Sequence, residues 1–227
     1  MKIIDRAKVI LQEVDAIHEI SEATKNPFCG KFKIGAFPTL APYLFPELVS
    51  KIKEKLSDLT LVLVEEKSDV LIDQLKSGVL DVAFLALPIE DEKLESVCLF
   101  EDVFQVAVPV GHPLAKNKTI TQKSLMKEKL LLLDEGHCLR DQALDLCHRY
   151  HIETEQDFRA TSLETLRQMV KAGTGITLMP NIAIGRNEEG IVYLPFEKNI
   201  PARSIALVWR KTTAKRLLLE EVIQLLK

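Results

Sequence analysis

The sequence predicts an α/β fold with two Rossmann-like lobes and a cleft between them. Segments typical of strands and of helices alternate along almost the whole chain, joined by short loops, which favours mainly parallel sheets. The pattern falls into two blocks of about 100 residues each. The chain has 227 residues, of which 47% are hydrophobic, and this is enough to bury a substantial core.

In the first block, apolar runs typical of strands cover Lys31–Ala36, Leu59–Val64, Val82–Leu87 and Val103–Val108. The run at Leu59–Val64 (LTLVLV) is apolar throughout, which predicts a central strand covered on both faces. A helix fits Pro42–Leu56. A second helix begins at Ser68, which is suited to capping it, and ends at Gly78.

In the second block, the predicted strands are Leu130–Leu133, Asp157–Ala160, Ile176–Met179, Ile191–Leu194 and Ser204–Trp209. Helices fit His137–Tyr150 and Thr213–Leu226. A third helix runs to Ala172, and Thr161 with Glu164 forms a capping box at its start.

The first segment predicts a linker helix over residues 1–26. Its apolar residues follow the steps of four and three that mark a heptad seam, at Ile3, Ala7, Ile10, Val14 and Ile17. We expect this stripe to pack on another helix, such as that of a second copy; the alternative is an amphipathic helix on its own domain. Because no cap signal precedes the helix, the chain is expected to be part of a longer one. Lobe I then comprises 27–102 and 205–227, and lobe II comprises 103–204.

Composition excludes several classes of function. The net charge of −3 argues against DNA binding by this chain alone, because such domains are usually basic. Neither a membrane-spanning run nor a signal peptide is evident, so we expect a cytoplasmic protein without a membrane partner. No cysteine pair has metal-site spacing, and no cofactor or metal is expected. Cys29 and Cys98 are predicted to be small buried core residues.

The segment that carries chemistry is Asp134–His148, which reads DEGHCLRDQALDLCH. Cys138 follows a predicted strand and opens a predicted helix, where the helix dipole lowers the pKa of a thiol. His137 and Arg140 add positive charge or hydrogen bonds nearby. These features indicate a thiolate that reacts with peroxide to give a sulfenic acid. The alternative is an inert cysteine buried in a helix.

The spacing of Cys138 and Cys147 has a mechanical consequence. Nine residues of helix separate the two Cα atoms by roughly 13 Å, at about 1.5 Å per residue. A disulfide requires them within about 7 Å. A disulfide and an intact helix therefore exclude each other, although the spacing does not establish that the bond forms. Thr39, Ser68 and the segment after Leu133 each follow a strand, so they are expected to converge on one site.

Four stretches resemble known regulators. GHCLRDQALDLC and RATSLETLRQMVKAGTGITLMP (Arg159–Pro180) are similar to OxyR-type peroxide sensors of the LysR family, whereas FPTLAPYLFP (Phe37–Pro46) and GHPLA (Gly111–Ala115) resemble LysR-type regulatory domains more broadly. The resemblance covers the chain from Gly30 onward. It implies a fold like that of type II periplasmic binding proteins.

The resemblance also implies roles for single residues. Cys138 would be oxidised by hydrogen peroxide, and Cys147 would resolve the product to a disulfide. The residues expected to bind and polarise peroxide are Thr39, Ser68, His137 and Arg140. At the position of Ser68 the family usually has threonine, so Ser68 retains the hydroxyl and lacks the methyl group. The alternative role of Ser68 is to cap the helix that begins there. Asp141 would support the site by pairing with Arg140, or it is a solvated acid in the first helical turn.

By resemblance, the chain is the sensing part of a transcription activator that responds to oxidative stress, and the DNA-binding helix-turn-helix domain is absent from it. It would form homodimers or tetramers, contact DNA and RNA polymerase only in the full-length regulator, and be reset by a glutaredoxin- or thioredoxin-like reductant. It would not be an enzyme, since it reacts once per signal. Alternatives are a metabolite-binding LysR domain without redox chemistry, a thiol peroxidase, and a solute-binding protein, which the missing signal peptide disfavours.

Overall fold

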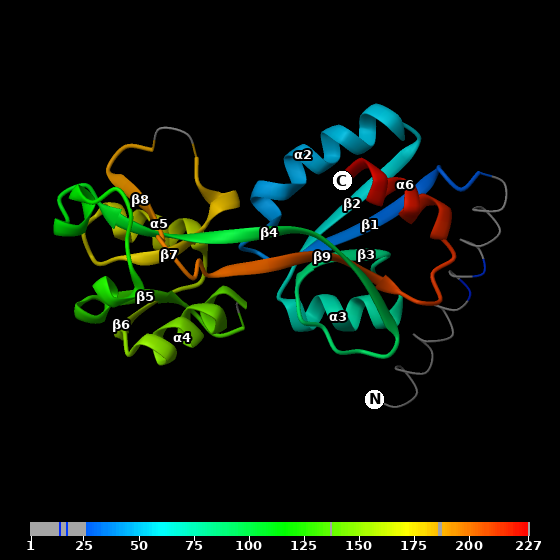
Figure 1. The fold of residues 1–227 in the computed structure, drawn as a ribbon. Coiled ribbons are helices and arrows are strands. Elements are labelled where there is room, and N and C mark those ends of the chain that lie inside the picture. The colour runs from blue at the N-terminus through cyan, green and yellow to red at the C-terminus, as the bar shows by residue number, and fades with distance from the viewer. Residues whose placement is uncertain (1–13, 15–16, 18–25, 137, 186–187, 227) are drawn as a thin grey trace. The chain divides into compact units, whose positions relative to one another are not determined.

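The computed structural model describes residues 14, 17, 26–136, 138–185 and 188–226 (Figure 1). The chain divides into two compact units. Unit 1 holds the residues up to Phe37 together with Ala41–Phe100 and Ile205–Lys227, and unit 2 holds Pro38–Leu40 and Glu101–Ser204. Two long strands, β4 (Leu94–Pro109) and β9 (Ala202–Arg210), each contribute one part to each unit.

Unit 1 is a mixed sheet covered by helices. Its strands β1 (Gly30–Ala36), β2 (Leu59–Glu65) and β3 (Val82–Ala86) join β9 in the order β2-β1-β3-β9. The pairs β1–β2 and β1–β3 are parallel, and β3–β9 is antiparallel. The helices α2 (Ala41–Lys55) and α6 (Arg216–Leu226) lie on one side of these strands, and α3 (Ser68–Ser77) lies on the other (Figure 1).

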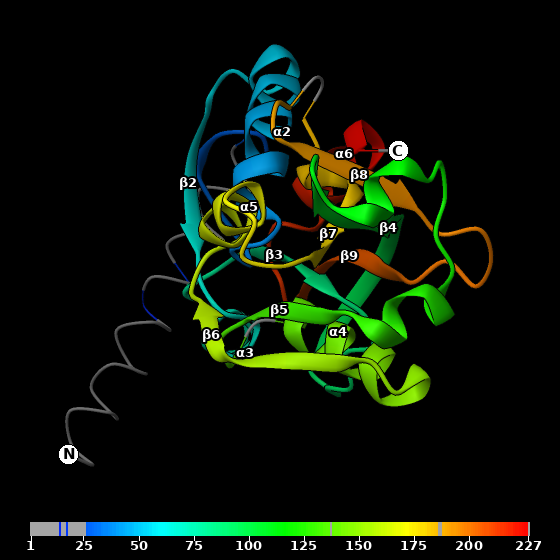
Figure 2. The same cartoon turned by 90° about the vertical axis from the view of Figure 1, so that its left-hand side faces the viewer.

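Unit 2 is built around β4, which pairs antiparallel with both β7 (Thr177–Pro180) and β8 (Ile191–Pro195). A second, parallel pair is formed by β5 (Lys129–Leu133) and β6 (Glu153–Ala160). The helix α4 (Cys138–Tyr150) lies beside this pair (Figure 2), and α5 (Leu163–Lys171) also packs on β5. The core joins side chains of β4, β5, α4, β7 and β8, among them Val106, Val108, Leu130, Leu132, Ala143, Leu146, Cys147, Leu178 and Leu194.

The predicted α/β class is confirmed, and every predicted strand and helix from Lys31 onward lies on an element of the same type. The expectation of mainly parallel sheets is wrong in part, because β4 and β9 make antiparallel pairs. The interpretation of Leu59–Val64 as a central strand is also wrong. It forms the edge strand β2, with Val62 37% and Leu63 40% exposed. An apolar run favours a strand, but its neighbours decide which faces are covered.

Two predicted helix caps are also wrong. Helix α5 is capped by Ser162, whose hydroxyl accepts a hydrogen bond from the Thr165 amide, and not by Thr161. Ser68 is the first residue within α3, and the capping position is taken by Lys67, which makes no side-chain cap hydrogen bond. In both cases the helix begins one residue away from the predicted boundary, which changes the side chain that occupies the capping position.

Two of the cysteines differ from expectation. Cys98 is exposed and Cys29 is half-buried, so neither is a buried core residue. The thiol of Cys29 donates a hydrogen bond to the backbone carbonyl of Asn26.

The predicted linker helix over 1–26 lies largely outside the described residues. Of its seam, Val14 and Ile17 are described as helical and exposed. Within the described part of the chain, no helix is long and apolar enough to cross a membrane.

Close packing around β1 makes a glycine necessary there. A Cβ atom added to Gly35 would lie 2.6 Å from Leu71 Cδ2 and 2.7 Å from Leu80 Cδ1. We expect Gly35→Ala to lower the free energy of unfolding of the chain by about 1–3 kcal/mol, because both buried leucines must leave their packed positions. Urea denaturation measures this loss. Gly111→Ala is the control, because its new methyl group meets nothing within 4 Å, and an equal loss in both variants contradicts the explanation.

Candidate functional site

The site is built around the start of α4 in unit 2. The chain leaves β5 through a tight turn at Asp134–Gly136, where Gly136 takes a φ of 82° that favours glycine. Cys138 is the first residue of α4 and is half-buried, whereas Cys147 lies on the last turns and is buried in the core of unit 2. Both are free thiols. One continuous helix therefore holds one thiol at its start and the other against the core.

A buried arginine connects the site to two other segments. Arg203, at the start of β9, is 2% exposed and donates through Nε to Asp102 Oδ2 at 3.0 Å, while its Nη2 lies 2.8 Å from the same oxygen. Its Nη1 donates to the Thr39 hydroxyl at 2.8 Å, and its Nη2 donates to the Thr39 carbonyl at 3.1 Å. The guanidinium also lies 5.8 Å from the centroid of the Phe104 ring. These contacts fix it in one position.

The electrostatics of Cys138 differ from the sequence-based expectation. Burial raises the pKa of its thiol, and the charge and hydrogen bond of Arg203 lower it, as does the Leu139 amide at the helix start. The charge of Asp141 also raises it, and the net pKa lies above the usual value. The prediction of a lowered pKa is therefore wrong for this conformation, because burial outweighs the helix terminus. Arg203 is the principal group that favours the thiolate.

Cys147 is held in a less reactive state. Burial alone raises the pKa of its thiol to about 11. Almost all of it is therefore protonated at neutral pH, and a protonated thiol is a poor nucleophile. Among the described residues, Cys138 thus has a cationic partner, Arg203, whereas burial alone acts on the pKa of Cys147.

The other predicted residues are placed in different surroundings. Thr39 is brought to Cys138 through their shared partner Arg203. Arg140 pairs with Glu135 at 3.2 Å, and its buried Nε has no hydrogen-bond partner among the residues that the structure describes. Asp141 is exposed in the first turn of α4. Ser68 belongs to unit 1, at the start of α3.

His137 lies outside the described residues, so its predicted contact with peroxide stays a prediction. Across the residues that the structure covers, no group of three or more histidine, cysteine, aspartate or glutamate side chains has the arrangement of a metal site.

Sequence reasoning missed Arg203 and Asp102. A signal was present, because Arg203 lies on the same face of its strand as Ile205 and Leu207, which are buried. Arginine is almost never buried without a partner, so this pattern predicts a buried acid nearby. Asp102 directly precedes the apolar run VFQVAV on β4 and is that acid.

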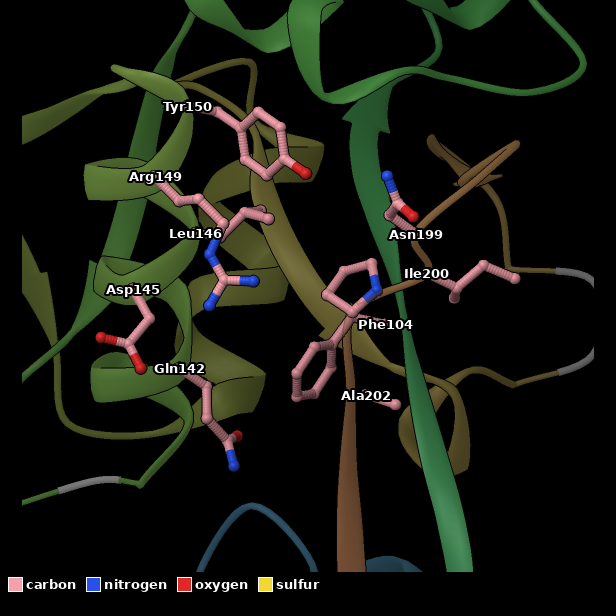
Figure 3. Close-up of a pocket in the computed structure, with 10 residues that line it drawn as sticks. Phe104, Gln142, Asp145, Leu146, Arg149, Tyr150, Asn199, Ile200 and Ala202 are labelled. Atoms are coloured by element: carbon pink, nitrogen blue, oxygen red, sulfur yellow. The ribbon is translucent and has the colours of Figure 1, made fainter.

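A pocket of about 390 Å³ lies against one face of α4. Five of its lining residues come from α4, namely Gln142, Asp145, Leu146, Arg149 and Tyr150 (Figure 3). The opposite wall is Phe104 of β4 and the segment Asn199–Ala202. Within the described part of the chain, the buried amide oxygen of Gln142 meets no hydrogen-bond donor. This side of α4 therefore borders a cavity, and Leu146 belongs both to its lining and to the core of unit 2.

Replacing Arg203 tests its effect on the thiol. We expect Arg203→Gln to raise the pKa of Cys138 further and to slow its alkylation at neutral pH on the order of tenfold, because one pKa unit changes the thiolate fraction tenfold. Iodoacetamide labelling across a pH series, read from the peptide that contains Cys138, measures this. The exposed thiol of Cys98 is the internal control. An unchanged pH profile for Cys138 excludes Arg203 as its electrostatic partner.

Comparison with known proteins agrees with this geometry. Residues 25–227 match the family model described as the LysR substrate binding domain. The chain is 38% identical over 229 residues to the DNA-binding transcriptional dual regulator OxyR of Escherichia coli K12, covering all of this chain and 75% of that protein. It is 39% identical over 213 residues to a hydrogen peroxide-inducible genes activator of Haemophilus influenzae, covering 92% and 70%.

Solved structures give the same result. The reduced form of OxyR aligns with a TM-score of 0.81 at 39% identity, covering 88% of this chain and 96% of that one. The oxidised form aligns with a TM-score of 0.80 at 40% identity over the same shares. The chain therefore belongs to the family of LysR substrate-binding domains, in the group formed by the OxyR regulatory domains.

Proposed function

We propose that this chain is the peroxide-sensing part of a transcription regulator, in which hydrogen peroxide oxidises Cys138 and Cys147 completes a disulfide. The relatives named as OxyR and as hydrogen peroxide-inducible activators support the class of function. The observation that carries the proposal is the arrangement of α4. It holds a thiol paired with a buried guanidinium at its start and a second thiol in the core nine residues later.

The first step takes place at Cys138. Its thiolate attacks one oxygen of hydrogen peroxide, the O–O bond breaks, and hydroxide leaves and takes up a proton to form water. The product is a sulfenic acid. Arg203 favours the thiolate, and the Thr39 hydroxyl, which already accepts from Arg203, keeps its own proton to donate to peroxide. Ser68, His137 and Arg140 are the further residues proposed to bind it, with Asp141 in a supporting role.

The second step requires α4 to unwind. Cys147 must attack the sulfur of the sulfenic acid, so that an S–S bond forms and the oxygen leaves as water. In the intact helix the two Cα atoms are separated by roughly 13 Å along the axis, well beyond the reach of a disulfide. Unwinding also frees Cys147 from the burial that raises its pKa to about 11. The conformational change therefore brings the second thiol within reach and activates it.

The packing of α4 suits such a change. Gln142, Asp145 and Arg149 of α4 line the pocket (Figure 3), so this part of the helix borders a cavity. The helix also places Ala143, Leu146 and Cys147 in the core of unit 2, and these side chains must repack. We propose that this repacking alters how copies of the domain associate as dimers or tetramers. In the full-length regulator, the altered association would change contacts with DNA and RNA polymerase, and a glutaredoxin- or thioredoxin-like reductant would reset the disulfide.

Two alternatives predict different chemistry. A metabolite-binding domain without redox function keeps its thiols after a sub-stoichiometric peroxide pulse, whereas the sensor loses two hydrogens across Cys138 and Cys147, which mass spectrometry of the intact chain and its peptides detects. A thiol peroxidase consumes many equivalents of peroxide in the presence of a thiol reductant, while a sensor reacts once per signal. Steady-state peroxide consumption separates the thiol peroxidase from the sensor.

Removing the proposed peroxidatic thiol is the first test. We expect Cys138→Ser to abolish the intramolecular disulfide, because no sulfenic acid forms for Cys147 to attack. Non-reducing peptide mapping after a peroxide pulse measures it. Amide hydrogen exchange over residues 142–147 should rise after oxidation in the wild type and stay unchanged in the variant. The exposed Cys98 provides the matched control, since Cys98→Ser should leave the disulfide intact. A disulfide in the Cys138→Ser variant would show that the assignment is wrong.

Removing the resolving thiol gives the complementary result. We expect Cys147→Ser to leave a longer-lived sulfenic acid on Cys138, because the only proposed intramolecular attack on it is lost. A sulfenate-selective probe followed by mass spectrometry detects this adduct. Cys29→Ser is the control and should give the short-lived adduct of the wild type. If no adduct can be trapped in the Cys147→Ser variant, Cys147 is not the partner of an oxidised Cys138.

A further inference from the structure

Two acidic groups share the buried guanidinium of Arg203. The first is the Asp102 carboxylate, which contacts Nε and Nη2 through Oδ2 at 3.0 and 2.8 Å. The second is the thiol of Cys138, whose anionic form is favoured by the charge of Arg203. The side chains of Arg203 and Asp102 are 0% and 2% exposed, so water screens these interactions little.

Arg203 already has several partners besides Cys138. Its Nε donates to the Asp102 carboxylate, its Nη1 donates to the Thr39 hydroxyl, and its Nη2 donates to the Thr39 carbonyl. Cys138 therefore interacts with a cation whose charge is already compensated by a carboxylate.

We propose that Asp102 sets the threshold of the sensor, because its carboxylate competes with Cys138 for the guanidinium of Arg203. This inference rests on the proposed function of Cys138. Asp102 does not touch peroxide and acts through Arg203, so it is a positioning and tuning residue. Its other oxygen, Oδ1, accepts from the Ile182 amide at 3.0 Å, which prevents the carboxylate from turning away.

Other groups around Cys138 also affect the pKa of its thiol. Burial and the charge of Asp141, on α4 itself, both raise the pKa of Cys138, while Arg203 of β9 and the Leu139 amide lower it. Asp141 is exposed, so solvent weakens its effect. Removing the charge of Asp102 leaves a buried cation without this counterion, and Cys138 is a neighbouring group that can become an anion. The variant should therefore favour the thiolate.

The test is Asp102→Asn, measured in the reduced chain without peroxide. We expect the pKa of Cys138 to fall by about one unit, which increases its rate of alkylation at neutral pH about tenfold. The readout is the pH profile of iodoacetamide labelling of the peptide that contains Cys138. Peroxide titration should then reach half-maximal disulfide at a correspondingly lower dose. Thermal unfolding confirms that the variant is folded.

Asp81→Asn is the matched control. Asp81 is another buried carboxylate, and it pairs with Lys215 at 2.9 Å within unit 1. The Asp81→Asn variant should lower the stability of the chain without changing the pH profile of Cys138 labelling. An unchanged or raised pKa of Cys138 in Asp102→Asn overturns the proposal. In an Arg203→Gln background the effect of Asp102→Asn should vanish; a full effect there shows that Asp102 does not act through Arg203.

If Asp102→Asn does not fold, Thr39→Val provides the second measurement. It removes one acceptor of Arg203 while the ion pair with Asp102 remains, so a smaller increase in Cys138 alkylation is expected, and no increase contradicts competition for the guanidinium. The two proposals fail separately. A shifted pH profile with no disulfide in the peroxide-treated wild type refutes only the proposed function, whereas a disulfide with an unshifted profile refutes only the role of Asp102.

Discussion

The site in unit 2 depends on the buried ion pair between Arg203 and Asp102. Burying either charge alone is strongly unfavourable, and breaking such a pair typically costs about 3–5 kcal/mol. The pair is therefore maintained, and with it the position of the guanidinium relative to Thr39 and Cys138. Because Asp102 lies on β4 and Arg203 on β9, the same contact fixes two strands and the electrostatic environment of a thiol.

The helix α4 places two identical thiol groups in different surroundings, and their reactivities differ for that reason. Cys138 lies where the helix begins, next to a cation, and Cys147 lies among aliphatic side chains that offer its anion no partner. A helix can hold this difference only while its hydrogen bonds persist. The structure thus links reactivity to secondary structure, since loss of the helix removes the burial that keeps Cys147 unreactive.

Most of the fold was accessible from the sequence because strand and helix patterns are local. Helix α4 and strand β5 follow from the apolar patterns of their own residues. The edge position of β2 was not predictable in this way, because it depends on which elements cover Val62 and Leu63. The cap of α5 differed by one residue for a similar reason, since Ser162 and Thr161 have almost the same local preference.

The candidate site was predictable to a smaller extent. Both cysteines and Thr39 stand out as residue types, and the structure connects Thr39 and Cys138 through Arg203. The net pKa of Cys138 was not predictable, because it is the balance between burial and a partner 65 positions away in the chain. Arg203 and Asp102 are separated by 101 residues, and only the folded chain brings them into contact.

The place of Cys147 in the core also bears on how the switch returns to rest. Under the proposed function, the oxidised domain keeps Ala143, Leu146 and Cys147 away from the packing that they have with Val106 and Leu130. The lost burial opposes the S–S bond and makes its reduction potential less negative than that of an unconstrained bridge. Refolding of one helix would then supply part of the driving force for reduction, so that the signal decays readily once peroxide is gone.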